Sequence, residues 1–195
     1  GAGYVLDERF ATFQFDARWG LSQERFTESR PGPDLDEDPH GSLWEYDARI
    51  QLFPAGKISA NAFALKADDR LPRPFLPSLE RDRERYGVEV LFNDRVLPMR
   101  LTFEDGDEIL TSYSRELRDD EQNSDRSLRY EAAWQPSEQQ RLALSYEYVD
   151  ERRRYGGSRN RFDTTRNDLN VNHVITFGKD NRSRLETLMR FEDES

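Results

Sequence analysis

Residues 44–64, WEYDARIQLFPAGKISANAFA, decide the fold of this chain. Apolar and polar residues alternate on both sides of the segment 54–57, and this period of two puts one residue class on each face of a β-strand. A helix would spread the same residues over all of its sides. Pro54 and Gly56 mark a short turn between the two runs, so the segment predicts a β-hairpin.

The same hairpin pattern recurs along the chain. After a single alternating run at 13–21, paired runs follow at 86–92 and 99–103, at 128–134 and 142–148, and at 169–177 and 185–191. We therefore expect an all-β fold, an antiparallel up-and-down meander of about nine strands that forms one domain over residues 1–195. The repeat of roughly 40 residues is also that of propeller blades, but a blade holds four short strands and this unit holds two longer ones.

Composition limits the possible functions. Hydrophobic and charged residues each make up 35% of the chain, which is too polar for a thick conventional core, although 12% aromatic residues argue against a disordered chain. The net charge of −10 argues against nucleic acid as a partner, because phosphate binding needs a basic surface. Cysteine is absent, which excludes disulfides and thiol chemistry.

Long polar connections separate the hairpins, in contrast to the short turns within them. These segments, 28–42, 67–85, 115–126 and 150–166, are predicted as loops. Loops of this length are uncommon in compact domains unless they have a function. Because consecutive strands alternate in direction, all of the long loops are expected at one end of the sheet and all of the short turns at the other.

Short turns at one end, long polar loops at the other and strands of about ten alternating residues resemble the porin-like class of outer-membrane β-barrels. The resemblance covers residues 13–191 and rests on this pattern, without a motif of one family. Aromatic residues directly before the short turns match the aromatic girdle of such barrels: Phe53, Phe92, Trp134 and Phe177. The resemblance implies a barrel, or a segment of a larger one, that acts as a pore or structural scaffold in the bacterial outer membrane. Its partners would be the lipid bilayer or lipopolysaccharide and other envelope proteins.

In a membrane barrel the polar face would line a wet lumen. The lumen-facing candidates are Glu45, Asp47, Arg49, Arg129, Glu131 and Glu147. The alternative is a soluble periplasmic or extracellular meander, sandwich or barrel that binds a ligand or protein partner through its long loops. In that protein the apolar face would be the interior, and alternation alone does not distinguish the two.

An acidic loop is the first candidate metal site. Asp34, Asp36 and Asp38 offer the oxygen ligands that Ca²⁺ prefers, but the glycine and distal glutamate of an EF-hand loop are missing, and a solvated loop is the alternative. The acidic run 104–108, EDGDE, has the same two readings, or it forms a turn or bulge within a strand.

Arginines gather in the last long loop. Arg152, Arg153 and Arg154 suit anionic sugars or lipid phosphates, because guanidinium binds phosphate oxygens in a bidentate manner, with loop solubility as the alternative. For catalysis, the only histidines are His40 and His173, which form no metal triad or nucleophile–base set by spacing. We therefore expect a protein that is not an enzyme and that has no cofactor beyond the Ca²⁺ candidate.

Overall fold

The computed structural model describes residues 1–4, 7, 9–23, 26–28, 35–37, 40–73, 76–112, 120–156, 161–178 and 182–195. These residues form only strands and their connections: β1 (Ala2–Tyr4), β2 (Ala11–Gln23), β3 (Phe26–Glu28), β4 (Leu35–Glu37), β5 (His40–Leu52), β6 (Ile58–Arg73), β7 (Leu76–Phe92), β8 (Met99–Ser112), β9 (Glu121–Ser137), β10 (Gln140–Tyr155), β11 (Arg161–Phe177) and β12 (Ser183–Glu194). Within the described ranges, no helix could span a membrane.

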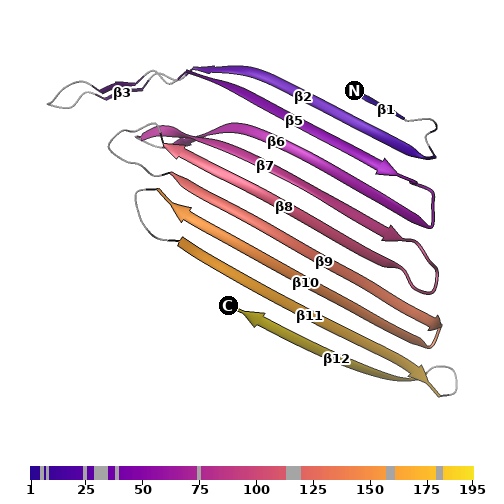
Figure 1. The fold of residues 1–195 in the computed structure, drawn as a ribbon. Helices are drawn as coiled ribbons and strands as arrows, with labels where there is room; N and C mark the ends of the chain where they lie inside the picture. Colours follow the sequence, from indigo (N-terminus) through magenta and orange to yellow (C-terminus); the bar gives the residue numbers. More distant parts are fainter. Residues whose placement is uncertain are drawn as a thin grey trace.

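One antiparallel sheet contains 10 of these strands, in the order β1-β2-β5-β6-β7-β8-β9-β10-β11-β12. β3 and β4 form a separate ribbon that extends from the ends of β2 and β5 (Figure 1). The predicted antiparallel meander is confirmed, because the expected strands correspond to β2 and to β5 through β12, with the short β1 added. The sheet is open: over the described residues, its edges β1 and β12 do not pair with each other.

The strands extend further into the charged segments than the sequence suggested. β6 continues to Arg73 and β7 starts at Leu76, so most of the expected loop 67–85 is paired strand. Likewise β10 and β11 take up most of 150–166, with Arg152 opposite Asp163. The expectation of long loops there was wrong because opposite charges facing each other across two strands stabilise a ladder even where both faces are polar.

The acidic run 104–108 is also regular strand. It lies within β8, and the register is unbroken on both sides, against β7 and β9. Neither the turn nor the bulge considered for it is present. Successive carboxylates therefore point to opposite faces, so Glu104 and Glu108 lie on one face and Asp105 and Asp107 on the other.

The register divides the sheet into an apolar and a polar face. Phe13 stands opposite Ile50, Val88 opposite Phe103 and Leu144 opposite Val171, and residues that face each other across strands share a face. We call the apolar surface the apolar belt; it consists of alternate residues of 13–21, 44–52, 58–64, 86–92, 99–103, 128–134, 142–148, 169–175 and 185–191.

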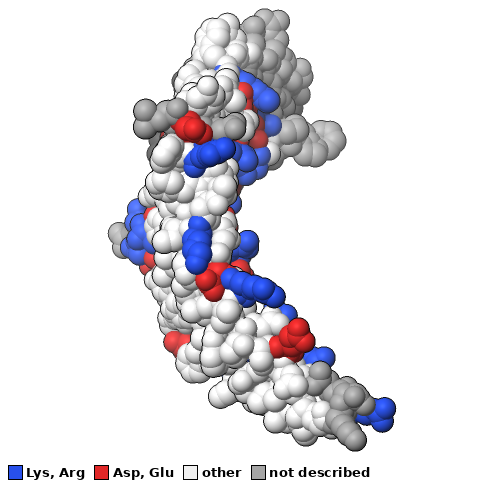
Figure 2. Space-filling model, turned by 90° about the vertical axis from the view of Figure 1, so that its right-hand side faces the viewer, with Lys and Arg blue, Asp and Glu red and all other residues white. Residues whose placement is uncertain are grey.

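The sheet is curved, with the polar face on the inside. Figure 2 shows the sheet end-on as an arc, seen from the end with the short turns. In the part nearest the viewer, the outer side of the arc carries few charged side chains. On β7, Tyr86 and Val88 of the apolar belt are exposed, whereas Gly87 is buried and Glu89 is half-buried on the polar face. Closer crowding of side chains is what the inside of a curve produces.

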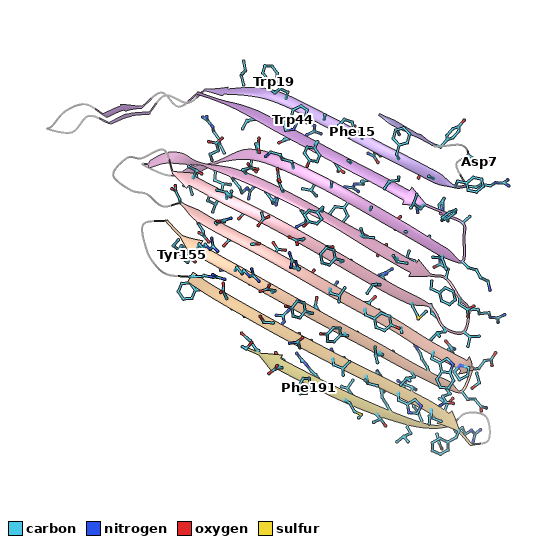
Figure 3. The ribbon with its side chains drawn as sticks, viewed as in Figure 1. Asp7, Phe15, Trp19, Trp44, Tyr155 and Phe191 are labelled. Carbon is cyan, nitrogen blue, oxygen red and sulfur yellow. The ribbon has the colours of Figure 1, made fainter. Side chains whose placement is uncertain are left out.

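Among the described residues, no second layer covers the apolar belt. The chain exposes 14211 Å² of surface, whereas a compact monomer of its mass would expose about 9,600 Å². Trp19, Val88 and Phe191 of the belt are 64%, 44% and 61% exposed, and no large side chain of the described residues is fully buried. Figure 3 shows Phe15, Trp19 and Trp44 lying along one layer of strands, with nothing packed over them.

Candidate functional site

Ion pairs and hydrogen bonds cross the inner face from β6 to β12. The side-chain amide of Asn61 donates to Glu89 (2.9 Å), which pairs with Arg100 (3.3 Å), and Arg100 reaches Glu131 on β9 (3.7 Å). A second series continues from β9 through Arg129–Glu147, Arg166–Glu147, Arg166–Asp168 and Arg190–Asp168. Each long strand in this part of the sheet contributes at least one member, so the two series, which we call the ion-pair network, link β6 to β9 and β9 to β12 across the polar face.

All six predicted lumen-facing residues lie on this inner face. Arg49 forms an ion pair with Asp47 (2.8 Å) on β5, and Glu45 stands opposite Arg18 with 3.9 Å between their charged atoms. Arg129, Glu131 and Glu147 belong to the network above. Period-two alternation alone was sufficient to place them together.

Other members of the network were not singled out from the sequence. Asp168 is only 14% exposed and receives two arginines, Arg166 at 3.1 Å and Arg190 at 3.8 Å. The sequence did indicate the face on which Asp168 lies, because Asp168 occupies the polar position before Leu169 in the alternating run of β11. Which arginine it meets depends on the register of β10, β11 and β12, and the sequence pattern does not give that register.

The three consecutive arginines do not converge on one ligand. They are neighbours on β10, so Arg152 and Arg154 point to the outer face and Arg153 to the inner face. Arg152 pairs with Asp150 (2.9 Å) and Arg153 lies 3.8 Å from Glu151. Binding of an anionic surface by this run stays a prediction, with Arg152 and Arg154 as the outward-facing pair.

The predicted Ca²⁺ site falls mostly outside the described residues. Asp34 and Asp38 lie there, and Asp36 belongs to β4, where it stands opposite Thr27. Among the described residues, no group of three acidic or histidine side chains is placed to hold a metal ion. The calcium site at Asp34, Asp36 and Asp38 stays a prediction.

A charged zone follows the apolar belt on the outer face, toward the long-loop end. Lys66 lies 3.1 Å from Asp82, 3.0 Å from Glu84 and 3.8 Å from Asp68. Desolvation favours the neutral amine, but the hydrogen bonds to Glu84 and Asp82 outweigh it and raise the pKa of Lys66. Burial raises the pKa of Asp68, opposed by the hydrogen bond it accepts from the backbone N–H of Trp44 (3.1 Å).

The apolar belt crosses the strands obliquely. The row of facing residues that starts at Tyr46 on β5 reaches Asp163 on β11. On β5 the belt begins at Trp44, two residues before this row, whereas on β11 it begins only at Leu169, six residues after it. Six strand steps from β5 to β11 cover about 29 Å, and this offset of about eight residues covers about 26 Å. The border of the belt is therefore inclined by about 42° to the rows.

Comparisons with known proteins give no relative. No protein-family model, no curated protein and no solved structure matches this chain. The two faces of the sheet are therefore the evidence for function.

Proposed function

We propose that this chain forms the wall, or part of the wall, of a bacterial outer-membrane β-barrel that acts as a pore or structural scaffold. The observation that carries the proposal is the exposed apolar belt on the outside of a curved, single-layer sheet whose inside is charged. A soluble sheet hides its apolar face in the protein interior, whereas a membrane barrel turns it outward to lipid.

The slope of the belt supports the same proposal. Strands of membrane barrels are tilted by about 35–45° from the membrane normal, so a horizontal lipid-facing band must cross them obliquely. The inclination of about 42° found here lies within that range. The belt covers seven residues on β7 (86–92) and nine on β5 (44–52), close to the roughly 9–11 residues of a tilted membrane strand.

Aromatic side chains border the belt on both sides. Phe92, Trp134 and Phe177 lie at the short-turn border, and Tyr86 and Tyr148 lie at the charged border. The fourth aromatic residue named from the sequence, Phe53, lies beyond the end of β5, in the turn. Aromatic rings of this kind collect where the apolar interior of a membrane meets water. Beyond Tyr86 the outer face is charged, which suits a position outside the lipid.

Strand direction is compatible with closure. β1 is antiparallel to β2, and the alternation along the sheet makes β1 antiparallel to β12 as well. The sheet contains 10 strands, and bacterial single-chain barrels have an even number. Closure by a β1–β12 contact, or with an even number of further strands between them, would keep every pair antiparallel.

The test is the location and detergent behaviour of the protein. Expressed in a Gram-negative host with an export signal, it should partition with the outer membrane and show a compact, heat-sensitive form on a detergent gel. Recovery as a soluble monomer without detergent would refute the proposal. Conductance in a planar bilayer then separates a pore from a scaffold, and the proposed role is not enzymatic.

A further inference from the structure

A hollow of about 770 Å³ lies on the inner face near the N-terminal edge of the sheet, over β1, β2, β5 and β6 (top of Figure 1). Its size is within the range of small-molecule sites, roughly 300–1,000 Å³. Facing residues of paired strands line it, among them Thr12, Gln14, Gln51, Asn61 and Phe63. The hollow is therefore built on regular strands and not on loops.

One row of facing residues in the hollow is polar but uncharged. It runs from Thr12 on β2 through Gln51 on β5 to Asn61 on β6. The amide nitrogen of Asn61 donates to Glu89 (2.9 Å), whereas its Oδ1 accepts no hydrogen bond from the described residues and stays accessible. Gln51 is exposed, and no described residue forms a hydrogen bond with its side chain. The row therefore offers both donors and acceptors to a ligand.

The neighbouring row supplies the charge of the hollow and an apolar wall. Arg49 is the only charged side chain among the described residues that line it. Its guanidinium donates to both carboxylate oxygens of Asp47, at 2.9 and 2.8 Å, so this charge is already matched. Phe63 stands opposite Arg49 and reaches toward β7, where a Cβ atom at Gly87 would lie 2.6 Å from its ring. The glycine thus leaves room for the ring, which borders the hollow.

These surroundings favour an uncharged ligand with several hydroxyl groups. A charged ligand would lose its hydration without meeting an unmatched counter-charge in the hollow. A hydroxyl group both donates and accepts, as do the hydroxyl of Thr12 and the amide of Gln51. Apolar C–H groups of the same ligand would contact Phe63 and Leu65, which also line the hollow. Neutral sugars combine these properties, because hydroxyls surround a ring whose faces carry C–H groups.

We propose that this hollow binds a neutral sugar of one or two hexose units. One hydroxyl donates to Oδ1 of Asn61, others exchange hydrogen bonds with Gln51 and Thr12, and a face of the sugar contacts Phe63. The site lies on the inside of the proposed barrel, but it depends only on the register of β1, β2, β5 and β6. It therefore goes beyond the function proposed above and can hold whether or not that function does.

The test is calorimetric titration of the full chain with maltose, in a zwitterionic detergent that has no sugar headgroup. Maltobionate, in which one hexose unit is oxidised to a carboxylate, is the charged comparison ligand. We expect maltobionate to bind several-fold more weakly than maltose, because its charge finds no unmatched cation in the hollow.

Two variants locate the site. Gln51→Ala should weaken maltose binding roughly twofold to tenfold, which corresponds to the loss of one neutral hydrogen bond. Ala2→Trp should also weaken it, because Ala2 lines the hollow from β1 and an indole ring there would fill part of the space. Gln122→Ala is the matched control: Gln122 is exposed on the outer face of β9, opposite Ile109, and its loss should leave Kd unchanged.

Three results would overturn the proposal: no maltose binding by the folded parent, equal Kd values for maltose and maltobionate, or an unchanged Kd in Gln51→Ala. Gln51→Ala decides the case if Ala2→Trp fails to fold, because the exposed Gln51 side chain has no hydrogen bond to a described residue that its removal could break. Recovery of the protein as a soluble monomer would refute the membrane proposal and leave this titration unaffected.

Discussion

Replacement of Val88 by arginine tests whether the apolar belt faces lipid. Val88 lies near the middle of the belt on β7, between Ala62 and Phe103, and is 44% exposed with nothing packed over it. In a bilayer, an arginine at the midplane of the lipid-facing surface costs about 2–4 kcal/mol, whereas a substitution at an exposed position in water usually changes stability by no more than about 0.5 kcal/mol. The two environments therefore predict clearly different losses for Val88→Arg.

Ile109 provides a matched control. It lies on the same outer face, on β8, and is 42% exposed, but it stands opposite Asp82 in the charged zone beyond the belt. Arginine at this height should cost only about 0–1 kcal/mol in a membrane. Urea unfolding of parent, Val88→Arg and Ile109→Arg proteins in lipid vesicles measures both values. Equal losses for the two variants, or a loss below 1 kcal/mol for Val88→Arg, would refute a lipid-facing belt.

Two further predictions concern the turns and the glycines. Asp94 accepts hydrogen bonds from the backbone N–H groups of Val96 (2.9 Å) and Leu97 (3.2 Å), which lower its pKa. Asp94→Ala should therefore reduce the free energy of unfolding at pH 7. The difference in the free energy of unfolding between parent and variant should shrink as the pH falls below about 4 and through the lowered pKa of Asp94. Unfolding curves over a pH series measure this difference, and a difference that stays constant would contradict the prediction. A Cβ at Gly87 would lie 2.6 Å from the ring of Phe63, so Gly87→Ala should reduce the free energy of unfolding by about 1–3 kcal/mol. Gly20→Ala is the control and should be nearly neutral, because a Cβ there would have no atom within 4 Å. Equal melting temperatures of the two variants would contradict this prediction.

Alternation was a sufficient signal for most of the sheet. It requires only that one face be apolar and the other polar, and β5 satisfies that condition over residues 44–52, whereas β7 satisfies it only over residues 86–92. It failed where both faces are polar. Arg81 pairs with Asp69 across β6 and β7, in a stretch that was expected to be a loop because it contains no apolar face.

The candidate site shows the same limit. Glu147 and Arg129 could be assigned to one face by counting residues. Asp82 and Glu84, the partners of Lys66, could not, because they fell in the expected loop 67–85. Cross-strand partners also depend on irregularities such as the register shift between Gln140 and Leu142. A shift of one residue changes which side chains meet, and no local sequence signal determines it.

The exposed surface of the belt bears on what covers it. The chain exposes 14211 Å², whereas a compact monomer of its mass would expose about 9,600 Å². An arginine at position 88 would be costly against lipid and also against a protein surface packed over the belt, because either environment would bury the charge without a partner. Loss of the depth dependence between Val88→Arg and Ile109→Arg would therefore mean that water reaches the belt, and that neither lipid nor protein covers it.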